Sequence, residues 1–270
     1  MSDLNGVEFV ILDVETTGLS PLSGDRIVEI GLIKLKDSKI TECFETLIDP
    51  RREISYSAFL VNGISMKMLE GAPPMENVLP DVLNFIKGAC LVGHNIKFDL
   101  KFLDYESSLA GHDLLDTVLT IDTARMARAL LPNLESYALG NLAHFLEINI
   151  STRHRAMADA ELTLKVFKKL LDIARAKNIC HLKILSYLFG IKKPSLEENR
   201  SKIQFIKEAL SEKYLLNLMY FGNASGLTER CVKPLQLTGR GRQATLTAFC
   251  HLRNQERDFK VERILNLGKI

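Results

Sequence analysis

The sequence predicts an α/β fold, with a mixed β-sheet flanked by helices, followed by a smaller α+β unit. Residues 8–14 (EFVILDV) form a nearly continuous apolar run, which is typical of a buried strand. Two more strand-like runs follow at 27–35 and 40–48, and helical and strand-like patterns alternate after them. Three consecutive strands before such an alternation indicate a mixed sheet covered by helices.

The other elements of the larger unit follow from composition and periodicity. Residues 36–39 form a hairpin-like link between the second and third strands. Pro73 and Pro74 separate two helical patterns, at 57–70 and 76–87. Two more helices are expected at 97–110 and 156–176, and two short strands at 89–93 and 117–121.

Composition changes along the chain indicate where its domains end. We expect the first domain to span residues 1–176. Residues 177–200 are expected to be a linker, because their second half is polar and contains Pro194. Residues 201–270 form the small α+β unit, with a helix at 203–210 and strands near 215–220, 244–251 and 258–264.

Charge is distributed unevenly in an otherwise ordinary globular composition. The 270 residues are 46% hydrophobic and 25% charged, which argues against wholesale disorder. The net charge of +2 hides an asymmetry, because residues 200–270 carry 13 Lys and Arg against 6 Asp and Glu. Such a basic segment suits an anionic partner, although a merely solvated basic surface would give the same count.

Cysteine usage and the N-terminus favour a cytoplasmic protein. The five cysteines are widely spaced and form no C-x-x-C pair, which argues against a disulfide framework or a zinc site. The N-terminus lacks the basic and long apolar segments of a signal peptide. No stretch is as long and apolar as a membrane span, so we expect no membrane partner.

Two acids lie at the end of the first strand. Asp13 and Glu15 are two residues apart, so they project from the same face of that strand. Two carboxylates side by side on a buried strand repel each other unless a cation neutralises them. Divalent ions would remove the repulsion and also supply chemistry.

The turn after these acids has the composition of a substrate-binding loop. Gly18 permits a sharp turn, and the hydroxyls of Thr16 and Thr17 are suitable donors to phosphate or sugar oxygens. Leu19 either contacts a base or caps the core.

Two later motifs bring further candidate residues. His94 and Asn95 follow the strand at 89–93, and Asp99 lies one turn into the next helix. Asn95 could simply cap that helix and Phe98 could pack in the core. His154 and Asp159 are five residues apart, a spacing that suits a histidine before the last helix and an acid on it.

Taken together, the three motifs resemble the DEDDh 3′→5′ exonuclease family, which includes the proofreading epsilon subunit of bacterial DNA polymerase III. The match comprises D-V-E-T-T-G-L, H-N-x-x-F-D and H-x-x-x-x-D, and it covers residues 7–175. The resemblance implies a ribonuclease H-like fold, two Mg²⁺ or Mn²⁺ ions bound by Asp13, Glu15, Asp99 and Asp159, and His154 as the base that deprotonates water. It also implies that the substrate is lined by Thr16, Thr17, Gly18, Leu19, His94, Asn95 and Phe98.

The C-terminal part resembles a WYL domain. The match includes Arg230-x-Val232-x-Pro234 and the segment around Cys250, but Ala244, Thr245 and Leu246 replace the name-giving tripeptide, so that only the Leu matches. The resemblance implies a small SH3-like barrel that senses ligands or binds nucleic acid, although it could also be a structural module. Its expected contacts to nucleic acid or a nucleotide are Arg253 and Arg263, with Arg257 as an alternative.

These features lead to one expected function and two alternatives. We expect an exonuclease that releases 5′-nucleotides from 3′ ends, with single-stranded DNA favoured over RNA as the partner. The alternatives are an exoribonuclease, and a nucleic-acid-sensing regulator in which the nuclease is subordinate. Replication or repair proteins are possible partners, since residues 185–189 (LSYLF) faintly resemble a sliding-clamp-binding peptide, with an amphipathic linker helix as the alternative.

Overall fold

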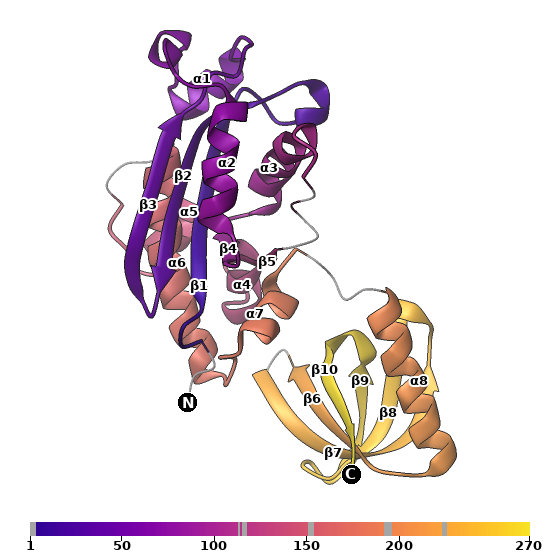
Figure 1. Cartoon of the computed structure of the whole chain (residues 1–270). Helices are drawn as coiled ribbons and strands as arrows, with labels where there is room; N and C mark the ends of the chain where they lie inside the picture. The colour runs from indigo at the N-terminus through magenta and orange to yellow at the C-terminus, as the bar shows by residue number, and fades with distance from the viewer. Residues whose placement is uncertain (1–3, 113, 115–117, 151–153, 192–195, 223–225) are drawn as a thin grey trace. The chain divides into compact units, whose positions relative to one another are not determined.

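The chain folds into two compact units, which Figure 1 shows in a computed structural model that describes residues 4–112, 114, 118–150, 154–191, 196–222 and 226–270. The first unit comprises Met1–Asp172 with Leu188–Ile191, and the second comprises Ile173–Tyr187 with Lys192–Ile270. The candidate nuclease motifs all lie in the first unit.

The first unit is built around a mixed five-stranded sheet with strand order β3-β2-β1-β4-β5. The central strand β1 pairs antiparallel with β2 and parallel with β4, and β4 pairs parallel with β5. This arrangement confirms the predicted mixed sheet. The strands are β1 (Glu8–Thr16), β2 (Ile27–Lys36), β3 (Lys39–Leu47), β4 (Cys90–Gly93) and β5 (Leu119–Asp122).

Alternate residues of β1 serve the two faces of the sheet. Val10, Leu12 and Val14 pack into the core formed with α2 (Met75–Ile86) and α3 (Lys97–Leu109). On the opposite face, the ring of Phe9 lies 5.3 Å from that of Phe167 in α6 (Ala156–Ala176). Because side chains alternate along a strand, Asp13 and Glu15 project on the same face as Phe9, toward the side covered by α6 (Figure 1).

One predicted helix of this unit is interrupted. Residues 57–70 form α1 (Tyr56–Asn62) and the short 3-10 helix η2 (Met66–Leu69), because Gly63 adopts a left-handed φ of 68° that ends α1.

Among the parts of the chain that are described, no helix combines the length and apolar character needed to cross a bilayer. The shorter helices of the unit are η1 (Pro21–Ser23), α4 (Thr123–Leu130) and α5 (Leu139–Phe145).

The segment predicted to be a linker contains helical structure. Helix α7 spans Leu182–Phe189, and α8 (Leu196–Glu212) begins before the helix start predicted at residue 203. The possible clamp-binding residues 185–189 therefore form the C-terminal half of α7. Leu185 and Phe189 are buried, which agrees with the amphipathic-helix alternative rather than with an exposed binding peptide.

The second unit contains a five-stranded antiparallel sheet with strand order β10-β6-β7-β8-β9. The prediction of one strand at 258–264 is wrong, because β9 and β10 are separated there by the 3-10 helix η4 (Val261–Arg263). Strand β7 was not predicted from the sequence, and β9 and β10 lie at the two ends of the strand order. The strands are β6 (Leu216–Gly222), β7 (Gly226–Thr238), β8 (Thr245–Cys250), β9 (Gln255–Lys260) and β10 (Ile264–Lys269).

Candidate active site

Asp13 and Glu15 lie where β1 extends beyond its parallel neighbour. The pairing between β1 and β4 ends at Ile11 and Val92, whereas the pairing with β2 continues along the whole strand. One side of β1 is therefore open at the level of the two acids. Both carboxylates are partly buried.

Asp99 occupies the space that β4 leaves beside β1. Its Oδ1 accepts a hydrogen bond of 3.0 Å from the backbone N–H of Val14, so the side chain takes the place of the next ladder acceptor. The residue lies in the first turn of α3 and is only 5% exposed. This bond holds the carboxylate against the strand that carries Asp13 and Glu15.

Asp159 reaches the same strand end from α6. It lies in the first turn of that helix and is 8% exposed. Its Oδ2 accepts a hydrogen bond of 3.3 Å from the backbone N–H of His154, whose φ of 63° turns the chain into the helix. The side chain of His154 is exposed.

The structure thus gathers all four predicted acids at one strand end. Carboxylate oxygens of Asp13, Glu15 and Asp159 lie within 4.8 Å of one another. Burial, and then the charges of Asp99 and Glu15, raises the pKa of Asp13 well above its usual value. Burial and the charge of Asp159 raise the pKa of Glu15 to about 7, and burial raises the pKa of Asp99 to about 8. Such a cluster resists full ionisation unless cations neutralise it.

The donor set fits hard divalent cations. Every candidate ligand is a carboxylate oxygen, with no thiolate and no imidazole in the cluster. Oxygen ligands suit Mg²⁺ and Mn²⁺ better than zinc, and a bound ion would lower the raised pKa values described above. The residues present are therefore able to hold the ions that the sequence resemblance implies.

A fifth acid, Glu29, anchors the start of α6 and was not identified from the sequence. It is completely buried, and it lies opposite Glu15 in the pairing of β1 with β2. Arg155 Nε donates to both carboxylate oxygens at 2.9 and 3.0 Å, Arg155 Nη2 donates at 2.5 Å, and the backbone N–H of Ala156 donates at 2.9 Å. The sequence did contain a signal for Glu29, because it is the one acid inside the apolar run IVEIGLI, and a buried acid needs a partner.

Close packing accompanies this anchor. A Cβ at Gly31 would lie 2.6 Å from the carbonyl carbon of Ala156 and 2.6 Å from the backbone N of Met157. Only glycine therefore allows β2 to approach the first turn of α6 this closely. The approach places Asp159 over the end of β1.

The turn after Glu15 is held by internal hydrogen bonds. The hydroxyl of Thr16 donates to the Gly18 carbonyl at 2.6 Å, and the hydroxyl of Thr17 donates to Asp25 at 3.4 Å. A Cβ at Gly18 would meet the carboxylate of Asp25 at 2.4 Å, so a larger residue there would require the Asp25 side chain to move. Leu19 is 81% exposed, which contradicts the alternative that it caps the core.

The second motif is also held in place by the protein. His94 Nδ1 lies 2.9 Å from the Thr123 hydroxyl and Nε2 lies 2.9 Å from the Tyr137 carbonyl oxygen. Phe98 is partly buried, and its ring centroid lies 5.1 Å from that of Phe102.

Asn95 is exposed, with a φ of 62°, and Ile96 rather than Asn95 occupies the N-cap position of α3, without a side-chain cap. The predicted capping role of Asn95 is therefore wrong. Its backbone N–H instead donates to Asp122 at 3.1 Å, and Asp122 also caps α4 by accepting from Ala124 and Arg125. An Asp between a strand and a helix was a capping signal that the sequence analysis did not use.

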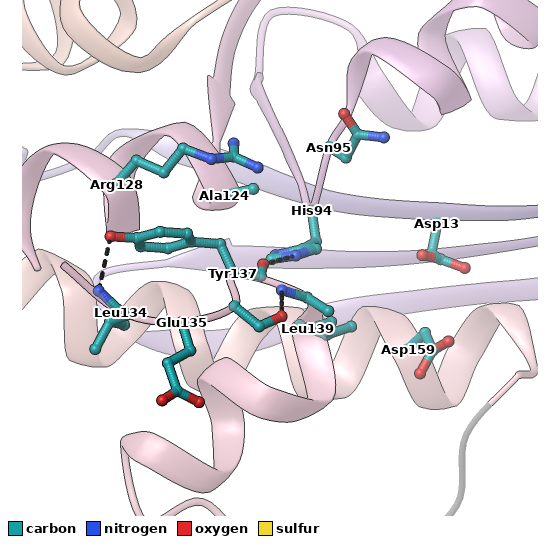
Figure 2. Close-up of a pocket in the computed structure, with 12 residues that line it drawn as sticks. Asp13, His94, Asn95, Ala124, Arg128, Leu134, Glu135, Tyr137, Leu139 and Asp159 are labelled. Atoms are coloured by element: carbon teal, nitrogen blue, oxygen red, sulfur yellow. Dashed lines mark hydrogen bonds between the residues drawn. The ribbon is translucent and has the colours of Figure 1, made fainter. Parts of the chain in front are cut away.

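A cavity of about 770 Å³ opens beside the acids (Figure 2). Asp13 and Asp159 lie at one end of it, and Arg128, Glu135 and Tyr137 lie at the other. His94 and Asn95 lie between these ends, on the wall that follows β4 (Figure 2). The volume is within the range of about 300–1,000 Å³ that is usual for ligand sites.

Two of the three predicted contact residues of the C-terminal unit lie in its β8–β9 hairpin. Arg253 is exposed in the turn between β8 and β9, and Arg257 is exposed on β9, opposite Ala248. Arg263 is partly buried in η4. Arg257 forms no ion pair with another described residue, and Asp258 accepts a hydrogen bond of 2.7 Å from Thr247 instead.

Comparison with known proteins identifies both parts of the chain. Residues 10–167 match the family model described as Exonuclease (RNase_T), and residues 202–268 match that of the WYL domain. The predicted resemblances to the exonucleases and to the WYL domain are therefore confirmed.

Two relatives each match about three fifths of this chain. The DNA polymerase III PolC-type protein of Caldanaerobacter subterraneus subsp. tengcongensis is 42% identical over 165 residues, which is 61% of this chain and 12% of that protein. DNA polymerase III subunit epsilon of Rickettsia conorii is 37% identical over 174 residues, which is 62% of this chain and 75% of that protein.

A solved structure of Exonuclease X in complex with 5′ overhanging duplex DNA is 26% identical, with a TM-score of 0.53. The match covers 66% of this chain and 99% of that one. The exonuclease model matches more than half of this chain. The chain therefore belongs to the Exonuclease (RNase_T) family, and its residues 202–268 form a WYL domain.

Proposed function

We propose that the chain is a divalent-metal-dependent 3′→5′ exonuclease that releases 5′-nucleotides. The observation that carries the proposal is the cluster formed by Asp13, Glu15 and Asp159, with Asp99 held beside it by the Val14 N–H. When bound, two Mg²⁺ or Mn²⁺ ions would stabilise the charge on the attacking and leaving oxygens of the phosphodiester. The acids hold these ions, and in this proposal they do not transfer protons themselves.

His154 is the proposed general base. Its backbone N–H donates to Asp159 at 3.3 Å, so the main chain of His154 is held next to a proposed metal ligand while its side chain is exposed to water. A neutral imidazole is able to accept a proton from water and is the usual general base near neutral pH. The ion pair between Glu29 and Arg155 holds the residue that follows His154 against β2.

The proposed substrate is single-stranded DNA with a free 3′ end. Support comes from the relatives, because the PolC-type protein and the epsilon subunit are both named as DNA polymerase III components. Exonuclease X was solved with DNA bound. We assign the substrate-lining role to Thr16, Thr17, Gly18, Leu19, His94, Asn95 and Phe98.

Among these residues, Leu19 is the best placed to contact a base, since it is apolar and 81% exposed in the turn that follows Glu15.

The WYL domain is proposed to bind nucleic acid or a nucleotide and thereby to tune the nuclease. Residues 200–270 carry 13 Lys and Arg against 6 Asp and Glu, whereas the active site is acidic. A tethered basic domain raises the local concentration of a polyanionic substrate. Arg253 and Arg263 are the proposed contacts, with Arg257 as the alternative. Arg263 is partly buried on η4, whereas Arg253 and Arg257 are both exposed, so these two are used in the test below.

The wider assignments follow from these two roles. We propose residues 1–176 as the nuclease domain and 201–270 as the accessory domain. The protein would act in the cytoplasm, and replication or repair proteins would be its partners.

Product analysis with 3′-labelled substrates tests the proposal. Single-stranded DNA, a duplex with a mismatched 3′ end, and RNA of the same sequence are incubated with the full chain and Mg²⁺. We expect labelled 5′-mononucleotide to be the first labelled product, and we expect single-stranded DNA to be digested fastest. Faster digestion of RNA would favour the exoribonuclease alternative, and internal cleavage products would refute the proposed 3′→5′ direction.

A second experiment separates the nuclease from the accessory role. Replacing Arg253 and Arg257 together by alanine should weaken binding of single-stranded DNA, measured by anisotropy, without changing the cleavage of a dinucleotide. If the double variant binds DNA, RNA and mononucleotides as well as wild type does, the proposed binding role is refuted and the WYL domain is better explained as a structural module.

A further inference from the structure

The end of the cavity away from the acids has no role in the proposed catalysis. It is lined by Arg128 and Tyr137, which come from α4 and from the segment before α5 (Figure 2). The guanidinium carbon of Arg128 lies 5.3 Å from the centroid of the Tyr137 ring. The cavity therefore combines an acidic end with an end formed by a cation and an aromatic ring.

Tyr137 is fixed at both ends. Its hydroxyl donates to the Leu131 carbonyl at 2.8 Å and accepts from the Leu134 N–H at 3.3 Å. Its carbonyl oxygen lies 2.9 Å from His94 Nε2. The ring is therefore a preorganised wall, which loses little side-chain entropy when a ligand stacks on it.

Arg128 differs from the other arginines near the active site. Arg26 is paired with Glu106, and Arg155 with Glu29. Arg128 is exposed and forms no ion pair or hydrogen bond with any residue that the structure describes. Glu135 lines the same end of the cavity without pairing with Arg128.

A guanidinium without a carboxylate partner, held over an aromatic ring, is suited to a phosphate group. Its planar fork of donors matches two phosphate oxygens, and the neighbouring ring provides a stacking surface for a base or a sugar. The ligand class is therefore a nucleotide within a polynucleotide chain.

The position of the cavity indicates which nucleotide this is. The cavity is lined by Asp13 and Asp159, but not by Glu15 or by the turn at residues 16–19. In the proposed function the terminal nucleotide lies at that turn and the scissile phosphate lies at the acids. The cavity then offers the rest of the strand a path past His94 and toward α4.

We propose that Arg128 and Tyr137 form a subsite for the nucleotide on the 5′ side of the scissile phosphate, with Arg128 binding its phosphodiester and Tyr137 contacting its base or sugar. This inference rests on the proposed exonuclease function. It implies that the preferred substrate has at least one nucleotide upstream of the scissile phosphate. Loss of the subsite weakens the binding of oligonucleotides but removes no contact to the terminal nucleotide.

Two substrates separate this subsite from catalysis. A single-stranded oligonucleotide occupies both sides of the scissile phosphate. The p-nitrophenyl ester of thymidine 5′-monophosphate has a phosphodiester but no upstream nucleotide. Full-length wild type and the Arg128→Ala variant are compared on both with Mg²⁺, and the ratio of the two kcat/KM values is measured.

We expect Arg128→Ala to lower the ratio of oligonucleotide to ester activity by about ten- to hundred-fold, the usual effect of one charged hydrogen bond. Arg128→Lys should recover part of the loss, because it keeps the charge without the fork. The salt dependence of oligonucleotide binding should fall in slope by about 0.7, the value for one lost phosphate contact on a single strand.

Lys165→Ala provides the matched control, since Lys165 is exposed on α6 and does not line the cavity. It removes one positive charge from the same unit and should leave the ratio unchanged. Equal losses on both substrates with Arg128→Ala would place the terminal nucleotide in the cavity and overturn the proposal. Wild-type activity of Arg128→Ala on both substrates would overturn it as well. If wild type hydrolyses neither substrate, the exonuclease function itself fails.

Discussion

One added methyl group at Gly31 should displace the helix that carries Asp159. Gly31 lies on β2 directly opposite Asp13. The new Cβ would lie 2.6 Å from the Ala156 carbonyl carbon, where an ordinary contact is 3.4–4 Å. Backbone atoms cannot rotate away as a flexible side chain can, so the first turn of α6 would have to retreat by about 1 Å.

This displacement should affect catalysis more than folding. Extra volume in a packed interface costs about 1–3 kcal/mol of the free energy of unfolding. A shift of about 1 Å in a catalytic group costs on the order of 10²-fold in turnover. We therefore expect Gly31→Ala to remain folded at room temperature while its kcat on single-stranded DNA falls about 100-fold.

The assay combines urea denaturation with the release of labelled nucleotide from a 3′ end. Gly268→Ala is the matched control. Gly268 lies on β10 of the other unit, and a Cβ there would meet only the Cβ of Asn217, at 4.0 Å. If Gly31→Ala retains wild-type stability and wild-type kcat, the inferred close approach between β2 and α6 is wrong.

Three further predictions concern the same site. Arg155→Ala should lower the free energy of unfolding by about 3 kcal/mol in urea denaturation, since it leaves the buried Glu29 carboxylate without its main partner; an equal loss with Arg155→Lys would argue against the bidentate contact. His154→Ala should reduce kcat by about 10²- to 10⁴-fold while Mn²⁺ binding, followed by calorimetry, is unchanged, and a loss of Mn²⁺ affinity would reassign His154 to the metal ligands. Without metal, the melting temperature should fall as pH rises from about 4 to 8, because the pKa of Glu15 is raised to about 7 and that of Asp99 to about 8, so the folded protein binds protons that the unfolded chain has already lost; excess Mg²⁺ should reduce this fall, and a profile that is the same with and without Mg²⁺ would count against the cation site.

The sequence was sufficient for the parts of the site that lie in short motifs. Asp13 and Glu15 follow an apolar run, and strand alternation alone places them on one face. The gathering of Asp99 and Asp159 with them required the family resemblance, because residues so far apart in the chain give no local signal of contact.

Other features depend on tertiary contacts that local patterns do not contain. Glu29 looks like an isolated acid in an apolar strand, and its meaning comes from Arg155, more than a hundred residues later. Arg128 and Tyr137 belong to no motif and become visible only as two walls of one cavity. The break between α1 and η2 is different, since Gly63 was a local signal that the helical periodicity of 57–70 concealed.

The central claim is that Asp13, Glu15, Asp99 and Asp159 hold cations that hydrolysis requires. The most direct test is the release of 5′-mononucleotide from 3′-labelled single-stranded DNA, measured in EDTA and after addition of excess Mg²⁺, for wild type and for Asp13→Asn. We predict no release in EDTA, full recovery of wild type with Mg²⁺, and no recovery of Asp13→Asn although it melts no lower than metal-free wild type. Undiminished release by wild type in excess EDTA would contradict the claim.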